Sequence, residues 1–237
     1  MTIKIRPISE LLEYEFIIPK YQRGYRWDEE QIEALLNDLT AFQKGASNDD
    51  YYCLQPIVVV SDASDKNRFT VVDGQQRLTS ILLILKCLEG INTPCFTLAM
   101  EKRKEQEEFI RTGAFATMSD KYKNNIDNFY VKKAFDTISK WKVENPTAAK
   151  FISTLFLPDP MKGYAGVIWY EIDQTDAMDA FRRLNYGKIP LTPAELVKAI
   201  LLQTDCYPEN ERDLQQALAQ RRAMEWDEME HLSLIHI

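Results

Sequence analysis

At its most informative point the chain reads Phe69-Thr-Val-Val-Asp-Gly-Gln-Gln-Arg-Leu-Thr79. Aromatic and β-branched residues precede Asp73, which is typical of a strand, and Gly74 permits a tight turn. The residues from Gln75 to Leu88 are apolar on nearly every side, which indicates a helix buried in a core. We therefore expect a strand that turns at a glycine directly into a buried helix.

This turn has the features of an anion site. The first turn of a helix leaves backbone N–H groups without partners and carries the positive end of the helix dipole. Arg77 could bind a phosphate through two parallel hydrogen bonds, and Asp73 could hold Mg²⁺ or a water molecule. In the alternative interpretation, Asp73 merely caps the helix and Gly74 merely makes the turn. The Walker A pattern G-x-x-x-x-G-K-[ST] occurs nowhere in the chain.

The flanking segments mix helix and strand patterns. Asp28 can cap a helix in which Gln31 reaches back to the cap. Strand patterns cover 54–60, 68–72 and 164–172, and helix patterns cover 101–111, 120–144, 176–184, 192–202 and 208–231. Because helices interleave with a few strands, the sequence predicts a mixed α/β or α+β domain.

A second segment, Ile18-Pro-Lys-Tyr-Gln-Arg-Gly-Tyr-Arg-Trp27, carries three cations and three aromatic residues in a non-helical stretch. Gly24 lies among them and permits an unusual backbone angle. Planar guanidinium groups and aromatic faces suit a phosphate beside a base. The alternative is a surface loop whose aromatic rings pack inward while its cations stay solvated.

A third segment, Phe181-Arg-Arg-Leu-Asn-Tyr-Gly-Lys-Ile-Pro-Leu-Thr192, joins two expected helices through a tight turn. In a functional interpretation, Asn185 and Lys188 line a polar cleft. In the structural alternative, the two arginines interact favourably with the negative end of the helix dipole, and Asn185 with Gly187 caps the C-terminus of the helix.

Composition excludes several classes of protein. The chain has 237 residues, 29 basic and 36 acidic, and its net charge is −7. Its two histidines, His231 and His236, both lie in the last seven residues, so the body of the chain excludes a Ser-His-Asp triad, a histidine-ligated zinc site and a histidine-based nuclease centre. The four cysteines form no C-x-x-C pair, and no targeting or membrane-spanning stretch is visible. We expect a cytoplasmic protein.

Taken in order, the three segments resemble the N-terminal domain of GmrSD-type restriction endonucleases. The resemblance rests on Ile18-Pro-x-Tyr-Gln-Arg-x-Tyr-x-Trp27, on Asp73-Gly-Gln-Gln-Arg-Leu-Thr79, and on Phe181-x-x-Leu-Asn with a downstream Pro-Leu-Thr. It implies a ParB/sulfiredoxin-like α+β fold, with a small mixed sheet and a large helical portion. It also implies that the domain binds and hydrolyses a nucleoside triphosphate (NTP).

The same resemblance implies roles for individual residues. Asp73 and Arg77 are the expected catalytic pair, with Asp73 as the expected Mg²⁺ ligand. The expected nucleotide contacts are Tyr21, Gln22, Arg23, Arg26, Gly74, Gln75, Gln76, Thr79, Asn185 and Lys188. The third segment departs from many members, which have a glycine where this chain has Lys188.

The implied organisation is an NTP-binding domain over 1–205, with a helical insertion at about 101–160. Residues 206–237 would form a linker helix toward a missing C-terminal His-Asn-His nuclease domain. We therefore expect no DNA cleavage by this chain alone, and contact with modified DNA through the full-length protein. We expect no membrane partner. A homo-oligomer is compatible with the sequence, which leaves the oligomeric state open. The alternatives are a non-enzymatic module that binds modified DNA, and a fragment that depends on its missing half.

Overall fold

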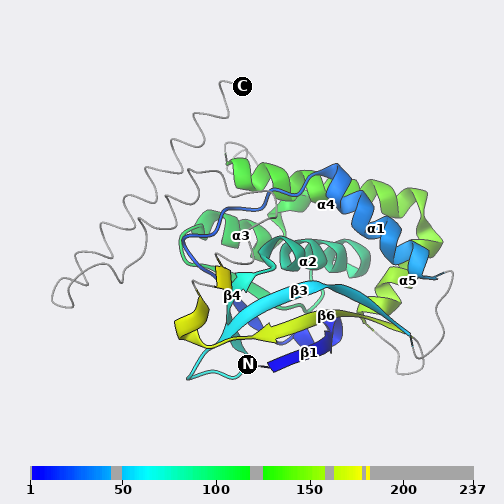
Figure 1. Cartoon of the computed structure of the whole chain (residues 1–237). Helices are drawn as coiled ribbons and strands as arrows, with labels where there is room; N and C mark the ends of the chain where they lie inside the picture. Colours follow the sequence, from blue (N-terminus) through cyan, green and yellow to red (C-terminus); the bar gives the residue numbers. More distant parts are fainter. Residues whose placement is uncertain (1, 44–49, 118–124, 158–162, 178–179, 182–237) are drawn as a thin grey trace.

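The computed structural model describes residues 2–43, 50–117, 125–157, 163–177 and 180–181. Within these ranges, a six-stranded mixed sheet carries a layer of helices (Figure 1). The strands are β1 (Thr2–Pro7), β2 (Glu15–Ile18), β3 (Tyr51–Ser61), β4 (Arg68–Asp73), β5 (Thr97–Met100) and β6 (Tyr164–Glu171). This arrangement confirms the α+β prediction, and the likeness to ParB and sulfiredoxin stays a prediction.

The strand order across the sheet is β1-β6-β3-β4-β2-β5. β1 pairs antiparallel with β6, and β3 pairs antiparallel with β4. The pairs β3/β6, β2/β4 and β2/β5 are parallel. β4 therefore lies in the interior of the sheet, between β3 and β2, and the chain passes directly from its end into the next helix.

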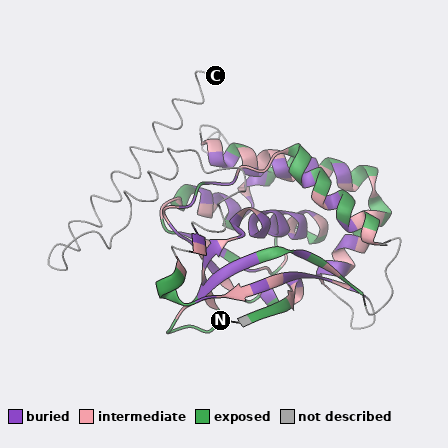
Figure 2. Cartoon of the chain, in the orientation of Figure 1, coloured by how far each residue is buried: buried purple, intermediate pink, exposed green. Residues whose placement is uncertain are grey.

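The helices are α1 (Glu29–Gln43), α2 (Gln75–Glu89), α3 (Lys104–Thr112), α4 (Ile126–Glu144) and α5 (Pro146–Phe156). Short 3₁₀ turns occur at Ile8–Leu11, Ala114–Ala116 and Gln174–Asp176. α2 lies between the sheet and the outer helices and is buried along most of its length (Figure 2). The expectation of a buried helix after Gly74 is confirmed.

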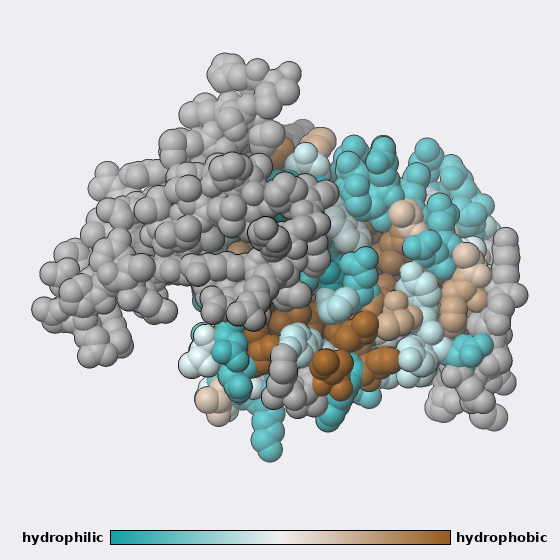
Figure 3. Space-filling view, viewed as in Figure 1, coloured by the Kyte–Doolittle hydropathy of each residue, from teal (hydrophilic) through white to brown (hydrophobic). Residues whose placement is uncertain are grey.

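The side chains of β3 and β4 alternate between two apolar clusters. Val59 and Val71 face the main core, which also contains the apolar side chains of α2 and the inward faces of α1, α4 and α5. Val58, Val60 and Val72 belong to a smaller cluster with Ile172 and Phe181. Alternate residues of a strand point to opposite faces of the sheet. Both faces are therefore covered at the end of β4 where the glycine turn begins. Over α1 and α4 the outer surface is mostly hydrophilic (Figure 3).

Several element boundaries differ from the sequence predictions. α3 begins at Lys104 instead of Glu101, and α4 begins at Ile126 because the Asn125 side chain caps it by accepting from the N–H groups of Asp127 and Asn128. The two edge strands, β1 and β5, were not predicted. Outside the described residues lie the predicted helices 192–202 and 208–231, most of 176–184, and residues 120–124 of the helix predicted at 120–144.

The predicted cap of the first long helix is confirmed. The Asp28 N–H donates to Gln31 Oε1 at 2.9 Å, and the Glu30 N–H donates to Asp28 Oδ1 at 3.1 Å. This reciprocal pair fixes where the loop that follows β2 ends and α1 begins. Within the described ranges, no helix combines the length and the apolar character that crossing a bilayer requires.

Candidate anion site at the start of α2

The candidate site is the corner where β4 turns into α2. Gly74 adopts the left-handed conformation, with φ +102°, and an added Cβ would lie 3.0 Å from a side-chain carbon of Ile57. The first helical bond runs from the Leu78 N–H to the Gly74 carbonyl at 2.9 Å. The N–H groups ahead of Leu78 have no acceptor within the helix, and they stand at the positive end of the helix dipole.

Arg77 is buried at this corner and is bonded within the fold. Its Nη1 donates to the Pro56 carbonyl, and its Nη2 lies 3.4 Å from Asp73 Oδ2. Burial lowers the pKa of the guanidinium, and the charge of Asp73 opposes that shift. The sequence interpretation has Arg77 facing a phosphate, whereas these contacts direct the side chain toward β3 and Asp73. Its direct contact with a phosphate stays a prediction.

The loop between β2 and α1 lies along the first turn of α2. Gln75 Nε2 donates to the Arg23 carbonyl at 2.7 Å, and Gln76 Nε2 donates to the Gly24 carbonyl at 3.0 Å. Gln76 Oε1 accepts from the Arg26 N–H at 2.8 Å. The structure therefore brings together the two motifs on which the sequence resemblance rests, although 52 residues separate the bonded pairs Gln75–Arg23 and Gln76–Gly24.

Several expected nucleotide contacts are also bonded inside the fold. The buried Gln22 donates through Nε2 to the Val71 carbonyl at 2.7 Å and to the Val72 carbonyl at 3.1 Å. The Thr79 hydroxyl, fully buried, donates to the Gln75 carbonyl at 3.0 Å. Both side chains hold the corner together, and their contact with a nucleotide stays a prediction.

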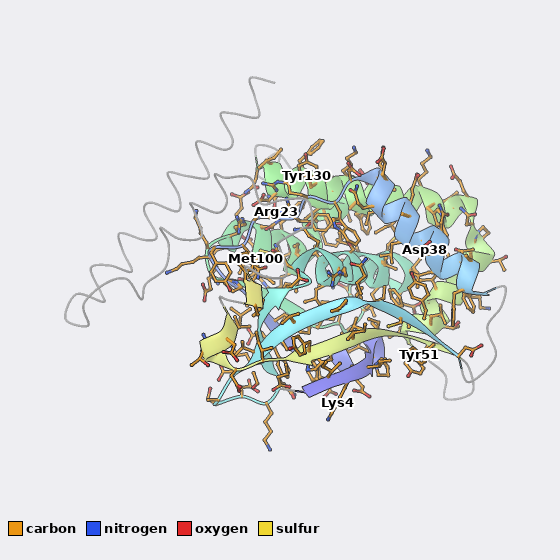
Figure 4. All side chains as sticks on the ribbon, in the orientation of Figure 1. Lys4, Arg23, Asp38, Tyr51, Met100 and Tyr130 are labelled. Atoms are coloured by element: carbon orange, nitrogen blue, oxygen red, sulfur yellow. The ribbon has the colours of Figure 1, made fainter. Side chains whose placement is uncertain are left out.

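The loop's aromatic residues pack inward. Tyr25 is fully buried, with its hydroxyl 2.8 Å from Ser80 Oγ. Tyr21 packs edge-on against Phe181, with ring centroids 5.1 Å apart, and burial together with the charge of Glu101 raises its pKa to about 12. Among the expected contacts, Arg23 is exposed, and it lies on the loop beside the end of α4 that carries Tyr130 (Figure 4).

The role expected of Gly24 needs a correction. Its φ does not lie in the left-handed region, so no unusual backbone angle requires a glycine there. The requirement is steric, because an added Cβ would lie 2.1 Å from Asp127 Oδ1. The contacting carboxylate comes from α4, far along the chain, and the local sequence around Gly24 contains no sign of it.

Sequence reasoning missed two residues beside the site, Asp127 and Arg103. Asp127 Oδ2 lies 2.8 Å from Arg103 Nε, and Asp127 Oδ1 accepts from Arg26 Nη1. Arg26 also donates to the Tyr25 carbonyl at 2.8 Å, and its guanidinium carbon lies 5.4 Å from the centre of the Tyr130 ring. In sequence, Asp127 looks like an ordinary acid in the first turn of a helix, and nothing nearby indicates its partners.

The third predicted segment is described only at its start. Phe181 is buried against Tyr21 and the small cluster, whereas Asn185 and Lys188 lie outside the described residues. No group of three or more His, Cys, Asp or Glu side chains that could hold a metal occurs in the part of the chain that the structure describes.

Two cavities open away from this corner. One, of about 390 Å³, lies where α2 ends against α4 and α5, and is lined by Leu88, Lys142 and Ala149 among others. The other, of about 230 Å³, lies between β5 and α3 and includes Lys86, Cys95 and Arg111. Neither includes a residue of the loop or of the turn from Asp73 to Arg77, so neither bears on the anion site.

The fold and the site together define a class of protein: an α+β domain with a glycine turn, a buried central helix and an arginine-bearing loop against its start. The family model of the GmrSD restriction endonuclease, N-terminal domain, matches residues 8–202, and the chain belongs to this family. The match spans both motifs that meet at the corner. Comparison with curated proteins gave no match.

Proposed function

We propose that this chain binds a nucleoside triphosphate at the corner between β4 and α2, and hydrolyses it. It would act as the N-terminal regulatory domain of a restriction protein that acts on modified DNA, with the nuclease domain elsewhere. Family membership supports the role in restriction. The observation that carries the nucleotide proposal is the loop of Arg23 held by Gln75 and Gln76 against the start of α2.

The chemistry follows from the geometry of the corner. The N–H groups after Gly74, which have no acceptor within the helix, would bind phosphate oxygens, and the exposed Arg23 would neutralise further negative charge. Hydrolysis requires that water attack the terminal phosphorus while the bond to the leaving phosphate breaks. Position and charge neutralisation supply most of that catalysis. The ion pair between Arg77 and Asp73 would hold the turn in place, so that its N–H groups keep pointing toward the phosphates.

The residues fit Mg²⁺ as a metal held largely by the substrate. Asp73 offers one carboxylate at the corner, and Mg²⁺ is commonly bound through one or two carboxylates plus phosphate oxygens and water. When bound, Mg²⁺ would neutralise the charge that develops on the phosphates. Asp73 would have to share its carboxylate between the metal and Arg77.

A thermal-shift titration with Mg²⁺ and each of the common NTPs tests the proposal, together with release of phosphate. Ligand at 100 times its dissociation constant should add about 2.7 kcal/mol to the free energy of unfolding. Arg23→Ala should weaken binding by about 10- to 150-fold, since a charge-assisted hydrogen bond is worth about 1.5–3 kcal/mol. Lys66→Ala is the matched control, because Lys66 is an exposed cation in the loop before β4, at the opposite end of that strand.

One outcome would favour the second candidate, a DNA-binding module. If no NTP stabilised the protein, but duplex DNA bound with an affinity that fell steeply with salt, the cations of the loop would be contacting the phosphate backbone. The exposed Arg23 and the neighbouring Lys20 are the residues that favour this candidate. Arg23→Ala would then reduce the slope of affinity against salt by about one ion.

A further inference from the structure

Asp127 is the centre of a largely buried charge cluster on the outer side of the loop. Its side chain is 11% exposed, and it pairs with Arg103, 9% exposed, and with Arg26, 22% exposed. One carboxylate therefore serves two guanidinium groups, from the residue before α3 and from the loop. Removing one partner from a buried pair of this kind leaves a charge without compensation.

The cluster reaches the loop at two points. Arg26 is itself a loop residue, and Arg103 Nη1 donates to the Gln22 carbonyl at 2.7 Å. Between these points, the carbonyls of Arg23 and Gly24 accept from the two glutamines at the start of α2. The loop is thus held from one side by α2 and from the other by Asp127 and Arg103.

Gly24 shows how close the approach is. An added Cβ would lie 2.1 Å from Asp127 Oδ1 and 2.5 Å from Oδ2. The backbone of Gly24 has no positive φ that would itself demand a glycine. A glycine is therefore required in the middle of the loop because the Asp127 carboxylate leaves no room for a side chain at position 24.

We propose that Asp127 is a positioning residue for the candidate site: its charge, through Arg26 and Arg103, fixes the loop that carries Arg23 against the start of α2. The consequence for nucleotide affinity rests on the proposed function, whereas the consequence for the loop does not. Residues 103 and 127 belong to the helical part of the chain, so that part controls the geometry of the site.

Hydrogen–deuterium exchange of the peptides covering 19–28 tests the proposal without any ligand. Asp127→Asn keeps the size of the side chain and removes its charge, and should speed exchange of the loop by about tenfold. Asp136→Asn is the control, because Asp136 lies on the same helix, is exposed and pairs with Lys132. It should leave the loop unchanged. Equal loop exchange in wild type and Asp127→Asn would overturn the proposal.

A double-mutant cycle on Gly24 and Asp127 gives a second, independent result. Gly24→Ala should lower the urea midpoint in the wild-type background, and should have little further effect in Asp127→Ala, where the obstructing carboxylate is gone. Additive effects would contradict the assigned contact. If Asp127→Ala does not fold, the cycle is run with Asp127→Ser.

Nucleotide binding completes the test. If wild type binds an NTP, Asp127→Asn should weaken the affinity by about tenfold and Asp136→Asn should not. If wild type binds none, the proposed function fails, and loop exchange and the double-mutant cycle still decide the role of Asp127.

Discussion

Arg77 stands where β3, β4 and α2 meet. Its contacts with the Pro56 carbonyl and with Asp73 join the three elements across the buried corner. The sequence interpretation gives Arg77 a role in phosphate binding and catalysis. The buried contacts indicate that Arg77 also contributes to the stability of the fold.

We expect Arg77→Ala to lower the free energy of unfolding by about 1–3 kcal/mol, because the half-buried Asp73 carboxylate and the Pro56 carbonyl both lose the Arg77 guanidinium. Arg77→Lys should recover part of this, since it keeps a charge near Asp73. Urea denaturation measures both. Arg111→Ala, which removes an exposed arginine from α3, is the control. A loss from Arg77→Ala no larger than the control's would mean that the buried contacts do not stabilise the corner.

Two features require a glycine at position 74: the left-handed backbone conformation and the close approach of Ile57. Gly74→Ala should destabilise by about 1–3 kcal/mol, because the left-handed φ disfavours a side chain and the Cβ would press on Ile57. Gly74→Ala in an Ile57→Ala background separates the two effects, since it keeps the left-handed φ and removes the side-chain carbon that lies 3.0 Å from the added Cβ. Calorimetric melting should show a smaller loss from Gly74→Ala in that background than in the wild type, and equal losses would mean that the Ile57 side chain does not matter.

The loop that carries Arg23 ends at the cap of helix α1. Asp28→Ala should lower the free energy of unfolding by about 1 kcal/mol, because the Glu30 N–H loses its acceptor at the start of α1. Asp38→Ala, an exposed acid further along α1, should change it far less. Urea midpoints compare the two, and similar midpoints would show that the cap does not stabilise α1.

Local patterns predicted the elements that carry the site, and could not predict their contacts. The strand before Asp73, the buried α2 and the Asp28 cap each depend on residues a few positions apart, so the sequence shows them directly. β1 and β5 are short edge strands of six and four residues, stabilised by pairing with distant β6 and β2. The contacts of Gln76 with the loop and of Asp127 with Arg26 likewise depend on the tertiary fold.

The largely desolvated Cys95 thiol and Tyr21 hydroxyl are among the groups that make the stability of the protein depend on pH in the alkaline range. Burial raises the pKa of the Cys95 thiol from 9.0 to about 12, and burial with Glu101 raises that of Tyr21 from 10.0 to about 12. Below the pKa of the unfolded chain both groups are protonated in both states. As pH rises past it, the unfolded state loses protons first and is favoured.

The free energy of unfolding should therefore be constant up to about pH 9 and fall as the pH approaches 12. Urea denaturation between about pH 8 and pH 11 measures this slope. Cys95→Ala should make the slope shallower, and Cys53→Ala, which removes an exposed cysteine, should leave it unchanged. A stability that rose with pH over this range would contradict the burial of both groups.

The most direct test of the proposed phosphate recognition at the start of α2 is a calorimetric titration that compares one NTP with its own nucleoside. If the N–H groups of the corner and the Arg23 loop bind phosphate oxygens as proposed, the Mg²⁺-bound triphosphate should bind saturably. The nucleoside should bind about 100-fold more weakly or not at all, since the phosphate contacts supply most of the free energy. Equal affinities for the two, or no binding of any triphosphate by the folded protein, would contradict the proposed recognition.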